Sequence, residues 1–405
     1  MDNKKGFLKG ALTGALAMLV ITAAIGAGVI VINHIDLGSM KKSDSDQVVG
    51  QYTENKLEEL KGLIDEVYLH EEDVDEETLT EGIYQGYIAA LNDPYSAYYT
   101  AEETKEMMES TSGEYSGIGA LMSQNRETGV ITIANVYENS PAAEAGMKNE
   151  DILYKVEGEE VTGVDLSEVV TQVKGKEGTE VKMTLLRGAD RQEIEVTAVR
   201  RKLQTQTVSY EMKEGQIGYI RVSEFDEVTL EQFREAKAAL ESQGMASMLI
   251  DLRGNPGGNL STVCDMLREI LPEGLIVYTE ERDGERTEYK CDGKTPWEKP
   301  LAVLINGASA SASEIFAGAV QDYGIGQLVG TTTYGKGVVQ QLFPMTDGTM
   351  VKLTIAEYFT PKGRNIDGTG IVPDVEVEYV YDETNPEADN QMEKALELLR
   401  GQVQQ

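Results

Sequence analysis

The 405-residue sequence is poor in histidine, cysteine and positive charge. Its two histidines, His34 and His70, both lie in the first fifth of the chain, so catalysis further along must do without a histidine base. Two cysteines, Cys264 and Cys291, exclude a disulfide framework and, with two histidines, a typical zinc site. A formal charge of -34, from 36 basic and 70 acidic residues, excludes nucleic-acid binding by a basic face. We therefore expect no metal, no cofactor and no nucleic-acid partner.

One long stretch near the N-terminus, residues 10–32, has no charged side chain. As a helix it spans roughly 34 Å, enough to cross a hydrocarbon core of about 30 Å. Lys4, Lys5 and Lys9 precede it and favour a cytoplasmic N-terminus, with everything after residue 33 outside. We expect an uncleaved, single-pass anchor in the cell membrane and an extracytoplasmic remainder; a cleaved signal peptide is the alternative.

The first two regions of the chain are distinguished by their apolar spacing. Residues 1–46 comprise a cytoplasmic tail, the anchor and a polar linker. Residues 47–112 place apolar side chains three and four positions apart, from Leu57 to Val67 and again up to a turn at Asn92. This spacing predicts a small helical region.

The rest of the chain mixes strands and helices. Residues 113–201 consist of short apolar runs between glycine turns, with helix starts at Ser140 and Asp165. In residues 202–405 strands alternate with helices, which predicts a mostly parallel sheet flanked by helices. The last twenty or so residues look loosely structured.

A run of small residues, 306–314, joins a predicted strand at 301–305 to a helix. Catalytic serines favour such a junction, because a sharp turn exposes the side chain beside the helix amides. An ordinary capping box fits the same residues, with Ser311 paired to Glu314. The stretch alone leaves both interpretations open.

A serine nucleophile in this chain needs a base other than histidine, and Lys336 is the natural candidate. Ser–Lys pairs are a known variant, in which burial lowers the lysine pKa from about 10.4 toward 7–8. Gly335 and Gly337 would let the backbone bring this side chain into a tight site, although a solvated loop lysine also fits. Residues 330–336 match the start of a phosphate-binding loop. We reject a nucleotide site because Gly337 replaces the required Ser or Thr and a strand follows.

A glycine-rich turn, residues 251–258, ends the preceding predicted strand. Free glycine amides beside a helix N-terminus make an anion site, which an acyl-transfer enzyme would use as an oxyanion hole. A turn that merely needs glycine fits this stretch equally well.

Together these segments resemble the C-terminal processing peptidases, or tail-specific proteases, a family of Ser/Lys endopeptidases. The match extends over nearly everything after residue 50, in the family's order. The segments that carry it are residues 91–96, 251–258, 309–315, 335–340, 360–364 and 370–374. The resemblance implies a mixed α/β fold, with a crotonase/Clp-protease-like β-β-α core, an inserted PDZ domain and an N-terminal helical region.

The resemblance also implies roles for single residues. The nucleophile, the general base and the amide that orients the base would be Ser311, Lys336 and Gln340. The oxyanion donors would be the amides of Ala312 and Gly257, with Gly258 close enough to leave that choice open. Asp322 matches an acidic position of some members, but we expect it to fold the end of its helix and leave it outside the catalytic set.

Residues 113–201 resemble a PDZ domain, and residues 140–146 carry its signature. PDZ domains bind a peptide C-terminus by strand addition, with the carboxylate held by loop amides. The peptide-binding residues would be Gly117, Ile118, Gly119, Ala120, Leu166, Val169 and Val170.

The resulting hypothesis is a bacterial, membrane-anchored serine endopeptidase that captures protein C-terminal tails through its PDZ domain. Its partners would be proteins with accessible apolar C-termini, and relatives suggest a homodimer. The alternative is a catalytically silent PDZ scaffold that only binds tails. A hydratase-like enzyme on the same core is a second rival, but it explains neither the export segment nor the PDZ signature.

Overall fold

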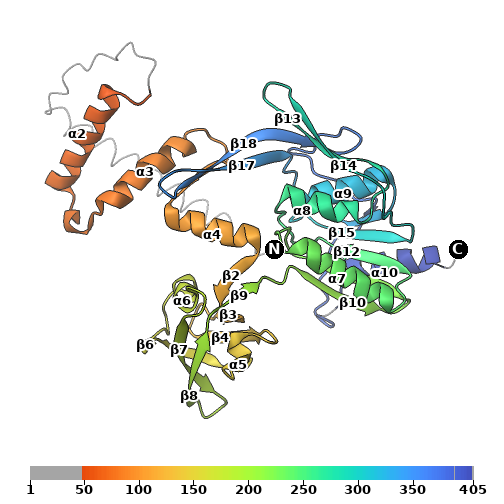
Figure 1. Ribbon diagram of the computed structural model, residues 1–405, viewed down its shortest axis with the longest axis horizontal. Coiled ribbons are helices and arrows are strands. Elements are labelled where there is room, and N and C mark those ends of the chain that lie inside the picture. The colour runs from red at the N-terminus through yellow and green to blue at the C-terminus, as the bar shows by residue number, and fades with distance from the viewer. Residues whose placement is uncertain (1–47, 387, 404–405) are drawn as a thin grey trace, which may run out of the picture. The chain divides into compact units, whose positions relative to one another are not determined.

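The computed structural model describes residues 48–386 and 388–403 (Figure 1). None of the helices within those residues is both long and apolar enough to span a membrane. The anchor predicted at residues 10–32 lies outside the described residues. The described chain falls into two parts, one ending at Leu79 and the other beginning at Thr80.

The first part is helical, as its apolar spacing predicts. It contains α2, a short 3-10 helix and the start of α3: α2 (Gln51–Val67), η1 (Glu71–Asp73) and α3 (Glu76–Ala89). Lys61 joins α2 to the start of α3, because its ammonium pairs with Asp65 at 2.5 Å and with Glu76 at 3.6 Å. No residue of α2 is fully buried: Leu60, Leu63 and Val67 of its apolar stripe are exposed, and Leu57 and Ile64 are partly buried.

The second part begins with the end of α3 and a tight turn. Two short elements follow: β1 (Ala97–Tyr99) and α4 (Ala101–Ser112). The Asp93 carboxylate forms the turn by accepting hydrogen bonds from the Tyr95 amide at 3.0 Å and the Ser96 hydroxyl at 2.5 Å. This turn brings Tyr95 to the edge of the candidate site described below.

The next segment is a small antiparallel barrel-like unit with two helices. Its elements are β2 (Glu114–Gly117), β3 (Ala120–Gln124), β4 (Ile131–Val136), α5 (Pro141–Glu144), β5 (Ile152–Val156), β6 (Glu159–Glu160), α6 (Leu166–Val173), β7 (Glu180–Arg187), β8 (Gln192–Val199) and β9 (Arg201–Gln204). Ser140 and Asp165 begin the two helices as predicted, each accepting a backbone amide hydrogen bond with its side chain. The unit has its own hydrophobic core.

The largest unit is built on a six-stranded sheet in the order β10-β11-β12-β15-β16-β19, parallel except for β10. Its elements are β10 (Val208–Lys213), β11 (Ile217–Val222), α7 (Thr229–Ser242), β12 (Ser247–Asp251), α8 (Leu260–Arg268), β15 (Leu301–Ile305), α9 (Ala312–Tyr323), β16 (Gln327–Gly330), β19 (Val375–Glu376) and α10 (Asn390–Val403). The prediction of a mostly parallel sheet flanked by helices is confirmed.

Alternate residues of the central strands face opposite layers of this sheet, as strand geometry requires. Met248 and Ile250 pack in the core that contains α7, α8 and α9. Leu249 packs in a second core with Ala395 and Leu399 of α10, on the other face (Figure 1). The prediction that the last twenty or so residues are loosely structured is therefore wrong, because α10 closes this face.

A second sheet is antiparallel and contributes two strands, β17 (Val338–Pro344) and β18 (Met350–Phe359), to the candidate site. Its other strands are β1, β13 (Gly274–Glu281) and β14 (Arg286–Cys291). Strands β17 and β18 form a hairpin in which Leu342 lies opposite Lys352. The glycine loop around Lys336 thus leads into a strand, as predicted, and not into the helix that follows a phosphate-binding loop.

Candidate active site

Ser311 lies at the junction of β15 and α9, in a strained backbone conformation. Its φ of 54° and ψ of -113° fall outside the regions that L-residues favour. Such strain persists only where the surrounding structure enforces it, and it is frequent at functional sites. Ser309, two residues earlier, is buried and donates to the Leu252 carbonyl at 2.8 Å, whereas Ser311 borders a cavity.

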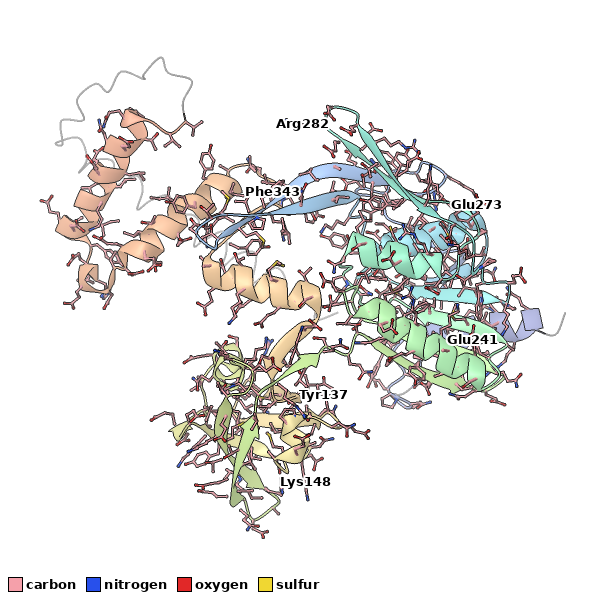
Figure 2. The ribbon with its side chains drawn as sticks, viewed as in Figure 1. Tyr137, Lys148, Glu241, Glu273, Arg282 and Phe343 are labelled. Carbon is pink, nitrogen blue, oxygen red and sulfur yellow. The ribbon has the colours of Figure 1, made fainter. Side chains whose placement is uncertain are left out.

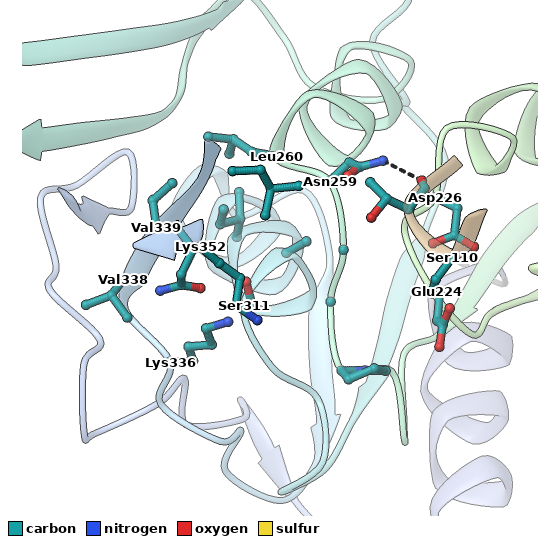
Figure 3. A pocket seen from close by; sticks show the side chains of 18 of the residues that line it. Ser110, Glu224, Asp226, Asn259, Leu260, Ser311, Lys336, Val338, Val339 and Lys352 are labelled. Carbon is teal, nitrogen blue, oxygen red and sulfur yellow. Dashed lines mark hydrogen bonds between the residues drawn. The ribbon is translucent and has the colours of Figure 1, made fainter. Parts of the chain in front are cut away.

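A cavity of about 370 Å³ brings the predicted catalytic and oxyanion residues together. Its lining includes all of them: Ser311, Lys336, Gln340, Gly257, Gly258 and Ala312. Figure 3 shows Lys336 extending towards Ser311. Residues separated by up to 83 positions in the sequence therefore meet at one place, although no single motif could show this.

The surroundings of Lys336 favour the uncharged form of its amine. Its Nζ lies 4.7 Å from the centroid of the Tyr95 ring. Burial lowers the pKa of Lys336 below its usual range, and the positive charge of Lys352 acts in the same direction. Asp93 and Glu314 oppose the shift without reversing it. A lysine with a lowered pKa can take a proton from a serine hydroxyl.

Gln340 is held in a network that leads back to the turn before β1. Its Nε2 donates to the Thr354 hydroxyl at 3.1 Å, and the Thr354 amide donates to the Ser96 hydroxyl at 3.1 Å. Among the hydrogen bonds of the described residues, none joins Gln340 to Lys336. The network fixes the position of the Gln340 amide at the edge of the cavity.

The glycine turn approaches the nucleophile closely. Gly257 has a φ of 113°, and a Cβ on it would lie 2.9 Å from the Ser311 Cβ, so only glycine fits. The Gly257 amide donates to the Asn255 side chain at 2.8 Å. The amides of Gly258 and Ala312 have no acceptor within the described residues, and Ala312 is the first residue of α9.

Glu314 ties the nucleophile and the base together through their backbones. Its carboxylate is fully buried and accepts the Ser311 amide at 2.8 Å and the Lys336 amide at 2.9 Å. It also accepts the Gly335 amide at 2.7 Å and the Thr333 hydroxyl at 2.6 Å. The glutamate of the expected capping box is therefore also the anchor of the loop that carries the base.

Tyr358 contacts the backbone carbonyl groups of the same two residues, Ser311 and Lys336. Its buried hydroxyl lies 2.6 Å from the Lys336 carbonyl oxygen and 3.1 Å from that of Ser311. Burial raises the pKa of this phenol well above its ordinary value, so it remains a hydrogen-bond donor. The sequence analysis missed Tyr358, because no local pattern connects it with residues 47 and 22 positions away.

Asp322 contacts a different segment. It pairs with Arg364 at 2.6 Å and accepts the Lys362 amide at 2.8 Å, which holds the loop after β18 against the end of α9. It is absent from the cavity lining. These contacts agree with a folding role for Asp322.

A second cavity, of about 300 Å³, lies in the unit formed by residues 113–201. Its lining includes Gly117, Ile118, Gly119, Ala120 and Val170. Tyr137, labelled in Figure 2, and Lys174 also line it. Of the predicted helix stripe, Val169 is instead fully buried in the core of the unit, and Leu166 packs against that core.

The fold and this site define a serine protease with an attached PDZ domain. Three family models match the sequence: "Peptidase family S41" at residues 216–377, "PDZ domain" at 116–198 and "Activating protease CtpB N-terminal domain" at 12–104. The chain belongs to the C-terminal processing proteases of peptidase family S41.

Relatives along most of the chain support this assignment. A "Probable CtpA-like serine protease" of Staphylococcus aureus (strain COL) is 33% identical over 90% of this chain and 71% of its own length. The "Carboxy-terminal processing protease CtpB" of Bacillus subtilis is 36% identical over 80% of this chain and 67% of its own length. The structure of a putative S41 protease from Bacteroides fragilis shares the fold, with a TM-score of 0.52 at 17% identity, covering 89% of this chain and 99% of that chain.

Proposed function

We propose that this serine protease is an endopeptidase in which Ser311 is the nucleophile and Lys336 the general base. The observation that carries the proposal is the meeting of a strained serine and a lysine of lowered pKa in one cavity. Both histidines precede residue 71, and Lys336 is the side chain of lowered pKa that extends towards Ser311 (Figure 3), so it is the natural base for this serine.

The reaction would proceed through an acyl-enzyme. Neutral Lys336 takes the Ser311 proton as Oγ attacks the scissile carbonyl, and the ammonium then protonates the leaving amine. The oxyanion would accept hydrogen bonds from the amide of Ala312 and from the glycine turn. There the Gly258 amide is free, whereas the Gly257 amide would first have to leave Asn255. Water, deprotonated by Lys336, completes the hydrolysis.

Substrates would be captured by the PDZ groove. Residues 117–120 would hold the terminal carboxylate with backbone amides, and Val170 would contact the apolar terminal side chain. We further propose that the charge-free residues 10–32 anchor the chain in a bacterial cell membrane, with the protease part outside, and that the protein is a homodimer.

Cleavage of an unfolded protein with an apolar C-terminus tests the catalytic assignment. The full-length chain in detergent is compared with its Ser311→Ala and Lys336→Ala variants. Ser242→Ala and Lys290→Ala, at exposed positions outside the cavity, are the matched controls. We expect cleavage by the wild type and both controls, and loss of cleavage in both site variants. Activity that survives Lys336→Ala would contradict the assignment of Lys336 as the general base. Binding of C-terminal tails without any cleavage would favour the alternative of a catalytically silent PDZ scaffold.

A further inference from the structure

The cavity that contains Ser311 carries opposite charges at its two ends. Figure 3 shows Lys336 and Lys352 close to Ser311 at one end, and Glu224 and Asp226 well separated from them at the other. The chain has 70 acidic and only 36 basic residues, so two neighbouring lysines at one end of a cavity run against its overall charge.

Lys352 supplies an unpaired positive charge. It lies on β18, is partly buried, and places its Nζ 5.3 Å from the centroid of the Tyr99 ring. Within the described residues it forms no ion pair with a carboxylate. Lys336 would be neutral when it acts as a base, so Lys352 is the lasting cation at this end. Partly desolvated charge of this kind is stabilised by an anionic group on a bound ligand.

Asp226 supplies the missing counterpart at the other end. Its side chain is only 6% exposed, and its carboxyl group accepts no hydrogen bond from the described residues. Burial and the adjacent charge of Glu224 raise the pKa of Asp226 to about 7. A buried carboxyl group that lacks a donor is costly unless a cation pairs with it. Both side chains line the cavity, where a ligand can reach them.

Part of the cavity lining is apolar. Aliphatic side chains from α8, α9 and β17 contribute to it: Leu260, Ile315, Val338, Val339 and Leu342. An extended peptide that runs from one charged end to the other would present a different side chain to each end, because successive residues are 3.2–3.4 Å or so apart along a strand. The nucleophile lies at the lysine end.

We propose that this cleft selects its substrate segment by the order of charges along it. An acidic side chain beside the scissile bond would pair with Lys352, a basic side chain further along would pair with Glu224 and Asp226, and apolar residues would lie between them. A segment with the reverse order would meet like charges at both ends, which lowers its affinity. This inference rests on the proposed function and specifies which peptides that site accepts.

The test uses C-terminally amidated peptides, whose blocked ends cannot use the carboxylate site of the PDZ groove. One aspartate or one lysine is placed at each position of an otherwise neutral, apolar sequence, and kcat/KM is divided by that of the neutral peptide. The wild type should prefer aspartate at one position and lysine at another, each by about fivefold. Lys352→Gln should abolish the first preference and Lys352→Glu invert it. Glu224→Lys should invert the second, and Lys290→Glu should change neither.

Binding distinguishes a failure of this inference from a failure of the proposed function. The same peptides, labelled with a fluorophore, are titrated into the full-length Ser311→Ala variant with and without the charge substitutions. If the wild type cleaves no peptide, the proposed function is wrong, and the charge order is judged from these affinities alone. Equal affinities and equal rates for aspartate and lysine peptides, in variants with unchanged thermal unfolding, would overturn the inference.

Discussion

At the scale of single residues, the proposed mechanism depends on a lysine that must lose its charge inside an acidic molecule. Burial provides the larger part of this effect and Lys352 adds to it, because two neighbouring ammonium groups repel each other. Asp93 and Glu314 work against it. The balance means that the fraction of neutral Lys336, and with it the rate, rises with pH below the usual lysine pKa.

Replacing Lys352 should move the pH dependence of cleavage. In Lys352→Gln the like charge is gone, so the pKa of Lys336 rises and the ascending limb of the kcat profile shifts to higher pH. We expect a several-fold loss of kcat at pH 7 and recovery at pH 10. The measurement is kcat from pH 6 to 10, with Lys290→Gln as control. An unshifted limb would show that Lys352 has no electrostatic effect on the base.

Glu314 and Tyr358 both hold the backbone of Ser311 and Lys336 in place, and replacing them should affect kcat more than the stability of the fold. Tyr358→Phe removes a hydrogen bond to the Lys336 carbonyl. Glu314→Gln replaces a carboxylate that accepts hydrogen bonds from the backbone amides of Ser311 and Lys336. Small misplacements of reacting groups cost about 10–100-fold in rate. We expect losses of that size in kcat with KM little changed, measured beside thermal unfolding. Loss of folding in parallel with activity would assign the two residues a structural role only.

At the scale of secondary structure, one arginine adds a polar link between the sheet and α10, beside the apolar packing of that helix. Arg253 pairs with Asp251 at 2.7 Å and with Asp389, just before α10, at 2.8 Å. It also donates to Gln391 at 3.1 Å, while Tyr219 donates to Asp251 at 2.9 Å. This network links β11, β12 and the C-terminal helix.

Removing Arg253 should loosen α10 before anything else. Arg253→Ala leaves the buried Asp251 carboxylate without its cation, a change that typically costs about 3–5 kcal/mol. We expect a lower thermal unfolding midpoint and faster amide hydrogen exchange in residues 390–403. Arg253→Lys should restore part of the stability, because the charge returns without the two-pronged geometry. Unchanged exchange in α10 would refute the link.

Short-range signals in the sequence predicted local structure well at this scale. Ser140 and Asp165 cap their helices, and β15 occupies residues 301–305 as expected. The sequence could not show contacts that depend on distant segments, such as Tyr358 against Ser311. It also could not show that Val169 faces the PDZ core while Val170 faces the groove, because neighbouring apolar residues on a helix look alike in a pattern.

At the scale of the whole molecule, one buried carboxyl group, that of Asp226, makes the stability of the fold depend on pH. The pKa of Asp226 is raised from its usual 3.8 to about 7, mainly by burial. The folded state then holds a proton that the unfolded state has released, so stability falls as the pH rises from about 4 to 7 and stays low above that.

Asp226→Asn should therefore stabilise the protein only where the carboxylate would be charged. At pH 8 we expect the variant to have a higher thermal unfolding midpoint than the wild type, with a gain in the free energy of unfolding on the order of 2–4 kcal/mol. At pH 4 the two midpoints should match. Asp374→Asn, a control at an exposed position, should not show this pH-dependent gain. Equal midpoints at pH 8 would contradict the burial argument.

The identity of the nucleophile is tested most directly by trapping the acyl-enzyme. The full-length protein is mixed with an activated peptide ester, quenched in acid within its first turnover, and mapped by mass spectrometry after digestion. The account predicts an acyl group on Ser311, formed faster as the pH rises, nearly absent in Lys336→Ala and absent in Ser311→Ala. An acyl group on another residue, or one formed at the wild-type rate without Lys336, would contradict it.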